Sequence, residues 1–387
     1  MDESEVDDVQ DHRPSECSAC GSDALLASDR RPTRQQVFEI PPRLIHVTEH
    51  RLHRALCTAC GATTTTALPE GVTASPFGPR LSALTAALVG VFRLSRRETS
   101  RLLRDVIGVS MSPGTVSAIE ERVSGALSSA HIEALGAVRT SQVAYVDETP
   151  WSRCGTLHWL WSGVCAHATV HRIDRRRSAK AMRKLIGRRY RGVLVTDRMG
   201  AYDQHPTERR QICWAHLERD FRALAEGPRG GRRFGKTAVG LAQAVMRAHR
   251  RFGEHQDRAR MQRELRKTWD QLLSLLVRGA DSNQRRVRGT SRHLLDRADA
   301  LWTFADVPGV APTNNTAERA VRKPVLWRRG SHGSQSERGL RFVERILTVT
   351  ATLRQRGDNV FDYLTAATNA AVRGQPPPTL VALPITR

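Results

Sequence analysis

The sequence predicts a multidomain α/β protein, in which two small N-terminal modules precede a core of strands and helices. Three observations lead to this prediction. Two Cys-x-x-Cys pairs lie near the start of the chain, apolar residues recur with helical spacing from Leu81, and from about Ser141 the period changes to that of β-strands. With 387 residues, of which 40% are hydrophobic, the chain can form two or three domains that each bury a core.

The charge balance favours a polyanionic partner. Lys and Arg number 61 against 39 Asp and Glu, so the net charge is +22 and nucleic acid is the first partner to consider. Basic residues are spread along the whole chain and no transmembrane run is present, which makes a membrane the weaker candidate. Residues 1–16 are acidic and lack the features of a secretory signal. We expect a disordered leader there, and a cytoplasmic, nucleoid-associated protein.

Clustered cysteines predict a structural zinc site. Seven cysteines, an odd number, in a chain expected to stay inside the cell argue against a disulfide framework. A Gly follows each pair and allows a turn in which backbone N–H groups face the sulfurs. Between the pairs, residues 34–41 and 43–56 alternate like the strands of a ribbon. We assign residues 17–75 to a zinc-binding module with four ligands, Cys17, Cys20, Cys57 and Cys60; the alternative is reduced, unpaired thiols.

Residues 80–135 are predicted to form a helical DNA-binding domain. Its first helix follows a Gly/Pro-rich linker and has one apolar face, made by Leu84, Leu88, Val91 and Phe92.

A helix-turn-helix follows in the same domain. Gly108 permits the turn, and Ser112 with Pro113 starts the second helix. An ordinary helical hairpin is the alternative. The residues that could contact DNA are Arg96, Arg97, Thr115 and Ser117.

The next part of the sequence predicts several strands and a helix. The segments "SQVAYVDETPW", "LHWLWSGVCA" and "ATVHRIDR" alternate like three consecutive strands, "SAKAMRKLIGRR" has helical spacing, and "GVLVTDRMGAYD" contains a buried strand. In "RRQICWAHLERDF" a short strand runs into a helix. Three strands, a helix and a strand follow the order of a ribonuclease-H-like core, which we assign to residues 140–221 and 312–330.

The remaining segments are predicted to be helical or irregular. Residues 222–311 contain no convincing strand and are interpreted as an all-helical insertion. Residues 331–373 form two C-terminal helices, and residues 374–387 are a Pro-rich tail.

Two aspartates follow apolar strands and are candidates for metal-bridging carboxylates. Asp147 ends "VAYVD" and Asp197 ends "VLVTD", and strand ends are where sheet proteins place their sites. A third carboxylate is available in "NNTAER", where Glu318 has two interpretations. It is either a metal ligand or the reaching-back carboxylate of a capping box whose N-cap is Asn315.

These segments resemble the transposases of insertion sequence 66, a bacterial family with a DDE catalytic triad. The resemblance is carried by "YVDETPW", by "LVTDRMGAYD" with "CWAHLERDF", and by "PTNNTAERAVRK" with "SERGLRFVERILTVTATLRQRG". It covers nearly the whole chain, and in that family a zinc-binding module and a helix-turn-helix also precede the catalytic core.

The resemblance implies a function and a site. Asp147, Asp197 and Glu318 would hold Mg²⁺ (or Mn²⁺) and catalyse cleavage and strand transfer of double-stranded DNA, at the element ends and the target. Self-association on DNA and accessory proteins of the element are expected. The alternatives are a catalytically inactive zinc and helix-turn-helix regulator, or a structure-specific nuclease with the same core.

Further residues near the triad receive supporting roles. Cys213 and His216 look like a cysteine-histidine signature of related transposases; we interpret them as packing and orienting residues, not zinc ligands. Arg319, Arg322 and Lys323 could hold phosphates, although a solvated basic helix face is an equal alternative.

Overall fold

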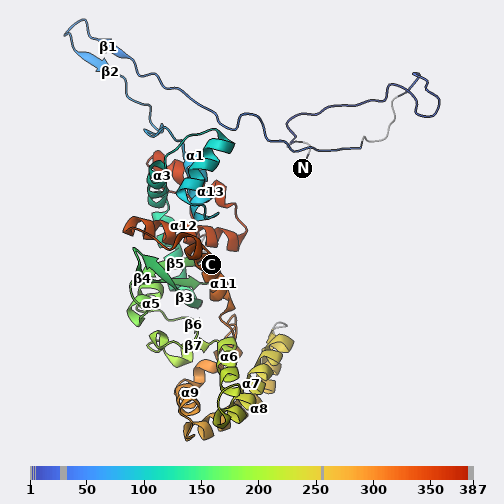
Figure 1. Cartoon of the computed structure of the whole chain (residues 1–387), viewed down its shortest axis with the longest axis vertical. Helices are drawn as coiled ribbons and strands as arrows, with labels where there is room; N and C mark the ends of the chain where they lie inside the picture. Colours follow the sequence, from blue (N-terminus) through green and yellow to red (C-terminus); the bar gives the residue numbers. More distant parts are fainter. Residues whose placement is uncertain (1, 3, 5, 27–32, 254–256, 382–387) are drawn as a thin grey trace. The chain divides into compact units, whose positions relative to one another are not determined.

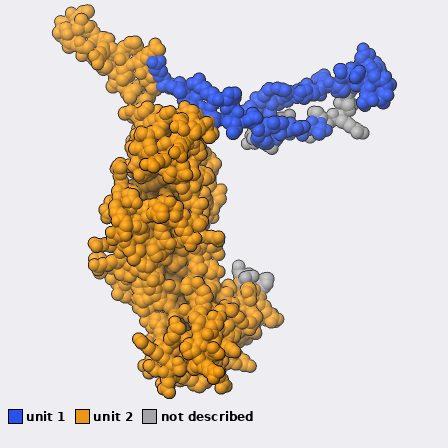
Figure 2. All heavy atoms as spheres, in the orientation of Figure 1, with its two compact units in different colours: residues 1–49 blue, residues 50–387 orange. Residues whose placement is uncertain are grey.

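The computed structural model describes residues 2, 4, 6–26, 33–253 and 257–381. It consists of two compact units, residues 1–49 and residues 50–387 (Figure 2). Parts of four predicted segments lie outside the described residues: 1, 3 and 5 of the leader, 27–32 of the zinc module, 254–256 of the insertion and 382–387 of the tail. Among the described helices, none combines the length and the apolar character that a membrane span requires.

The two Cys-x-x-Cys pairs have the same local backbone in both units. In each pair, the backbone N–H of the glycine that follows donates to the carbonyl of the first cysteine; the distance is 2.8 Å for both Gly21 and Gly61. Both glycines have a positive φ, 74° and 72°, which a residue with a Cβ rarely adopts. Each pair therefore forms the tight turn that its sequence predicts.

The predicted ribbon between these pairs is largely absent. The described residues 34–41 contain no strand, and of residues 43–56 only β1 (Arg54–Leu56) pairs, antiparallel to β2 (Thr63–Thr65). Val37 and Phe38 are 80% and 72% exposed, so no neighbouring layer covers an apolar face that would stabilise strands there. The alternation of residues 34–41 was therefore a wrong indicator of a strand.

The core of the second unit is a five-stranded mixed sheet. Its order is β5-β4-β3-β6-β7; β3 is antiparallel to β4 and parallel to β6, β4 is antiparallel to β5, and β6 is parallel to β7 (Figure 1). The strands are β3 (Val143–Arg153), β4 (Thr156–Val164), β5 (Thr169–Asp174), β6 (Val193–Thr196) and β7 (Arg210–Ile212), with α5 (Ala179–Ile186) between β5 and β6. All strands that the sequence predicts for residues 141–213 are present in this sheet.

The sheet separates two hydrophobic cores. Along β6, Leu194 packs into one core, whereas Val193 and Val195 pack into the other, as the two-residue period of a strand requires. The first core is shared with the flanking N- and C-terminal helices. The second is shared with the helices between β7 and residue 311, namely α6 (Trp214–Ala225), α7 (Arg229–Ala248), α8 (Arg258–Ala280), α9 (Arg285–Leu295) and α10 (Thr303–Asp306).

The N-terminal helices follow the predicted signals closely. After α1 (Pro79–Gly90), α2 (Arg96–Leu102) continues as a π-helical turn to Ile107 and ends at Gly108, whose φ is 81°. Ser112 caps α3 (Pro113–Ala126), and α4 (Ser128–Thr140) leads to the sheet. One detail was wrong: α1 ends at Gly90 and Phe92 is 62% exposed. Gly90 lies against Ile346, so the helix buries its small residues instead.

Two C-terminal helices complete the unit, α12 (Glu337–Arg356) and α13 (Val360–Val372). Helix α12 covers the edge strand β5. The backbone N–H groups of β5 residues 169, 171 and 173 donate to Thr352, Thr348 and Glu344 at 3.1, 2.9 and 2.6 Å. Four helical residues rise about as far as two strand residues, so the acceptors match the strand and protect its open edge.

Candidate active site

Asp147 lies inside β3, beside the strand that leads to Asp197; the prediction that it ends a strand was wrong, because β3 continues to Arg153 in its antiparallel pairing with β4. The parallel pairing of β3 and β6 ends at Tyr145 and Val195. Asp147 lies two residues further along β3, and Asp197 directly follows the last residue of β6, so the register brings the two segments side by side. The carboxylate of Asp197 also lies 4.0 Å from the guanidinium of Arg177. The topology therefore brings together two residues that are distant in the sequence.

Glu318 comes from helix α11 (Asn315–Ser331), whose start is fastened to the sheet. The side-chain amide of Asn314 donates to the carbonyl of Val146 at 2.8 Å, next to Asp147. The backbone N–H of Asn314 donates to the sulfur of Cys213 at 3.2 Å, and the N–H of Cys213 donates to the carbonyl of Thr196 at 2.8 Å, next to Asp197. These bonds hold the segments of all three carboxylates in one network.

The capping-box interpretation of Glu318 is wrong. Helix α11 begins at Asn315, its N-cap is Asn314, and no side chain caps it. The amide nitrogen of Asn314 donates to the sheet, and its carbonyl oxygen, the atom that could cap the helix, accepts no hydrogen bond in the described chain. Glu318 instead lies 3.3 Å from Nδ1 of His216 and 3.8 Å from Arg219.

Negative charge concentrates around Asp147. Burial, followed by the nearby charge of Glu148, raises the pKa of Asp147 to about 7, and the charges of Asp197 and Glu318 act in the same direction. On the opposite face of β3, Glu148 is buried and accepts hydrogen bonds from Arg177 and Tyr202. Burial still raises its pKa. The sequence interpretation missed Glu148; its position directly after Asp147 was the only available signal.

A cavity of about 750 Å³ opens beside Asp147, His216 and Glu318. Asn315 lines it too, together with the positive side chains Arg219, Arg319, Arg322 and Arg329. Lys323 is not among its lining residues. Burial and then Arg354 and Arg93 lower the pKa of Lys323, which therefore belongs to a different, electropositive environment.

In the described residues, one group of three metal-ligating side chains lies within 4.8 Å of one another: Cys213, His216 and Glu318. The three carboxylates do not form such a compact group there. Cys213 is fully buried at the N-cap of α6, and His216 lies one turn further along this helix. Burial, followed by the charge of Arg219, lowers the pKa of His216.

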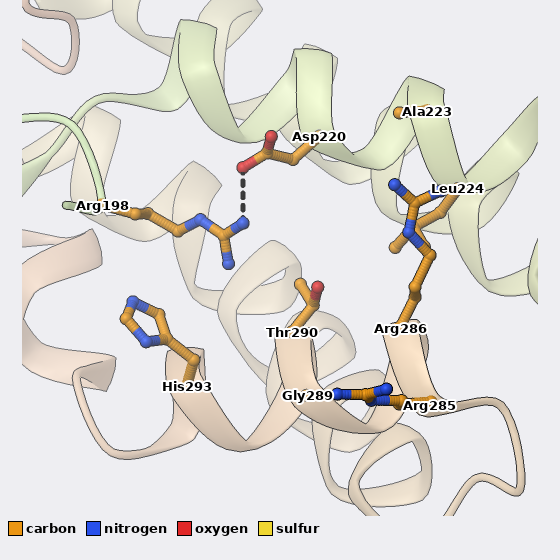
Figure 3. A pocket seen from close by; sticks show the side chains of 9 residues that line it. All are labelled: Arg198, Asp220, Ala223, Leu224, Arg285, Arg286, Gly289, Thr290 and His293. Atoms are coloured by element: carbon orange, nitrogen blue, oxygen red, sulfur yellow. Dashed lines mark ion pairs between the residues drawn. The ribbon is translucent and has the colours of Figure 1, made fainter. Parts of the chain in front are cut away.

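A second basic cavity, of about 620 Å³, lies between α6 and α9 (Figure 3). Arg198, the residue after Asp197, forms an ion pair of 2.8 Å with Asp220 of α6 there. Arg285, Arg286 and His293 of α9 also line this cavity. Neither Arg285 nor Arg286 has a hydrogen-bond or ion-pair partner in the described chain, so both guanidinium groups are available to an anion.

Of the residues predicted to contact DNA in the helix-turn-helix, three have partners within the protein. Arg96 forms a bidentate pair with the buried carboxylate of Glu120, at 2.8 and 2.7 Å. Thr115 is hydrogen-bonded to the cap residue Ser112, and Ser117 accepts from Arg338 at 3.4 Å. Arg97 is exposed.

The zinc ligands predicted near the N-terminus lie in both units, Cys17 and Cys20 in the first and Cys57 and Cys60 in the second. Backbone N–H groups of the turn, those of Ala19 and Cys20, lower the pKa of Cys17. The backbone N–H groups of Cys60 and Ala59 lower the pKa of Cys57 in the same way. Each pair thus presents a thiol whose ionised form is favoured, as a metal ligand must be. The shared four-ligand site stays a prediction.

Comparison with known proteins identifies the family to which the chain belongs. A sequence model of the transposase IS66 family matches residues 74–341, a range that contains Asp147, Asp197 and Glu318. Two uncharacterized proteins of Sinorhizobium fredii (strain NBRC 101917 / NGR234) are each 24% identical to the chain. The match to y4qI covers 64% of this chain and 51% of that protein, and the match to y4hP covers 90% and 70%. The chain thus spans about half the length of the first relative.

Proposed function

Because the chain belongs to the insertion sequence 66 family of transposases, we propose that it cleaves DNA at the ends of a mobile element and joins the freed 3′ ends to target DNA. The observation that supports this most is the pKa of Asp147, raised to about 7 by burial and by three neighbouring carboxylates. A protein gains nothing in stability from such a concentration of negative charge. It is useful where a cation has to bind.

The sheet supports a ribonuclease-H-like core. The order β5-β4-β3-β6-β7, with β3 antiparallel to β4 and parallel to β6, agrees with the strand order expected of that fold. In this arrangement Asp147 belongs to β3, Asp197 directly follows the neighbouring strand β6, and Glu318 belongs to a helix that follows the helical insertion.

The residues present fit a divalent metal. Carboxylate oxygens are the ligands that Mg²⁺ and Mn²⁺ prefer, and one oxygen of Glu318 is buried without a hydrogen-bond partner in the described chain. We assign Asp147, Asp197 and Glu318 as the ligands. Bound there, the metal would activate the attacking oxygen and neutralise charge on the reacting phosphate.

The chain's own cations would position the DNA. Arg319 and Arg322 on α11, with Arg219 on α6, line the cavity next to the carboxylates and can hold phosphates on either side of the scissile bond. Arg285 and Arg286 provide a second anchor on the insertion. Because Arg198 joins that cavity to Asp197, one DNA backbone could follow both cavities. We further propose that α2 and α3 recognise the element ends.

Substitution of Glu318 tests the proposal. Glu318→Gln keeps the size of the side chain but removes a charged ligand, so Mg²⁺-dependent cleavage of element-end DNA should fall at least 100-fold while folding and DNA binding persist. Asp147→Asn and Asp197→Asn should behave alike. Near wild-type cleavage by a folded Glu318→Gln protein would contradict the proposal.

A separate target DNA distinguishes the alternatives. A transposase yields joined product with it, whereas a nuclease yields cleavage alone. An inactive regulator binds the ends and yields neither product.

A further inference from the structure

We propose that Cys213, His216 and Glu318 form a binding site for one borderline transition-metal ion, Zn²⁺ or Co²⁺. This site differs in its ligand chemistry from the carboxylate site, but shares Glu318 with it. The metal site stands on geometry alone. Its effect on catalysis, described below, rests on the proposed function.

The geometry of the three side chains suits a single ion. One ligand atom from each residue lies within 4.8 Å of the other two, and no other such group occurs in the part of the chain that is described. Cys213 and His216 are three residues apart at the start of α6, which puts both on one side of the helix. Glu318 is brought to them by α11, through the bond from the N–H of Asn314 to the sulfur of Cys213.

The sulfur of Cys213 is surrounded by backbone N–H groups, although burial raises the pKa of the free thiol. The residue is fully buried and occupies the N-cap position of α6, where the helix dipole stabilises negative charge. The N–H of Asn314 donates to the sulfur at 3.2 Å, and the N–H groups of His216 and Ala215 also interact with it. Backbone N–H groups directed at sulfur are expected around a metal-bound cysteine.

Two atoms of this group are buried and lack hydrogen-bond partners in the described chain. They are Nδ1 of His216 and Oε1 of Glu318, which are 3.3 Å apart but not aligned for a hydrogen bond. Buried polar atoms are rarely left in this state, because each one loses its bonds to water without replacement. A metal ion between them would satisfy both atoms.

The ligand set selects the metal. Sulfur, imidazole nitrogen and one carboxylate oxygen suit Zn²⁺ and Co²⁺, whereas Mg²⁺ requires oxygen ligands. Three protein ligands also leave a fourth position open. A bound Zn²⁺ would withdraw Glu318 from Asp147 and Asp197, so zinc would inhibit the Mg²⁺-dependent reaction.

Cobalt is a suitable probe, because thiolate coordination to Co²⁺ gives an intense charge-transfer absorption. The titration uses the full chain in which Cys17, Cys20, Cys57 and Cys60 are replaced by Ser, so that the N-terminal cysteines cannot contribute. We expect saturation at one equivalent of Co²⁺ per chain, with displacement by Zn²⁺ but not by Mg²⁺. No DNA is present, so failure here is distinguishable from failure of the proposed function.

Three further variants in this background locate the site. Cys213→Ser should abolish the absorption band, and His216→Asn should weaken Co²⁺ binding at least tenfold. Cys165→Ser, which changes a buried cysteine elsewhere, should leave the titration unchanged. Circular dichroism verifies that each variant is folded. No charge-transfer band at all, or unchanged Co²⁺ binding in folded His216→Asn, would overturn the proposal even if Cys213→Ser does not fold.

Discussion

Two adjacent carboxylates in β3, Asp147 and Glu148, have opposite surroundings. Successive side chains of a strand point to opposite faces, so the two carboxylates have different hydrogen-bond partners, although the charge of Asp197 raises the pKa of both. Glu148 forms an ion pair of 2.6 Å with Arg177 and accepts a hydrogen bond from the hydroxyl of Tyr202. For Asp147 no ion pair is present among the described residues, and its partners in charge are other carboxylates. One acid is thus structural, whereas the other is available for a ligand.

This difference predicts an effect of Asp147→Asn on stability in metal-free protein. The pKa of Asp147 is about 7 in the fold against an ordinary 3.8, so below pH 4 both states hold the proton. Between pH 4 and 7 the unfolded state releases it first, and wild-type stability falls as pH rises. The variant lacks this penalty and should become more stable than wild type by up to about 4 kcal/mol near pH 7. Urea unfolding in EDTA at several pH values measures the difference, and a pH-independent difference would argue against the assigned environment.

At the scale of elements, the packing of α2 against α3 gives two consecutive arginines of α2 different roles. Arg96 is held by Glu120 of α3, whose side chain is 5% exposed. Its neighbour Arg97 is exposed on α2. Both residues were predicted to contact DNA, because two consecutive arginines cannot be distinguished by sequence alone. The ion pair of Arg96 with α3 gives the two side chains different surroundings.

Substitution of each arginine should separate these roles. Arg96→Ala leaves the Glu120 carboxylate without its partner and should lower the free energy of unfolding by about 1–2 kcal/mol. Arg97→Ala should change stability by less than about 0.5 kcal/mol, but weaken binding to element-end DNA and reduce the salt slope by about one. Thermal unfolding and salt-dependent binding measure the two effects. Equal stability of the two variants would show that the Arg96 pair contributes little.

The two arginines of the cavity between α6 and α9 are expected to contribute to the salt dependence of DNA binding. Replacing Arg285 and Arg286 by Ala removes two unpaired cations from the cavity between α6 and α9, and should reduce the salt slope of DNA binding by about two. Arg263→Ala with Lys267→Ala, two exposed residues of α8 outside this cavity, is the charge-matched control. Fluorescence anisotropy across a salt series gives both slopes. A similar loss in the control would mean that net charge, and not this cavity, determines binding.

At the scale of the whole molecule, the chain combines a core with two hydrophobic layers and N-terminal turns that have little core of their own. The Cys-x-x-Cys turns occur once in each compact unit, and β1 and β2 are exposed along their length. Such short elements bury too little apolar surface to be stable alone. A metal is the usual substitute for a core in small modules.

The predicted zinc site can therefore be tested by measuring the zinc content of the entire chain. Cys57→Ser should lower bound zinc by about one equivalent and speed proteolysis of residues 17–75, because binding and folding of such modules share one free energy. The sheet and its helices, which have their own cores, should keep their circular dichroism signal. Unchanged zinc content in Cys57→Ser would contradict the four-cysteine site. Loss of the whole fold would show that the module supports the core.

Local sequence patterns were sufficient to predict many of the helices, strands and turns of this protein. The two-residue period identified the strands from β3 to β6, the Ser112-Pro113 pair identified the start of α3, and Gly108 identified the turn before it. These features are encoded within a few residues, by backbone preferences and side-chain periodicity. The net charge of +22 likewise indicated the class of partner without any structure.

Tertiary structure decided the surroundings of each candidate side chain. Asn314 could cap α11 by local rules, but it bonds to Val146 across the sheet and to Cys213, 101 residues earlier in the chain. Glu318 consequently lies beside His216, and Arg96 beside Glu120. Such neighbours follow from chain topology and packing, which bring distant segments together, and no local period records them. The sequence by itself therefore determined the elements and the chemical types of the site, while the fold determined which of them meet.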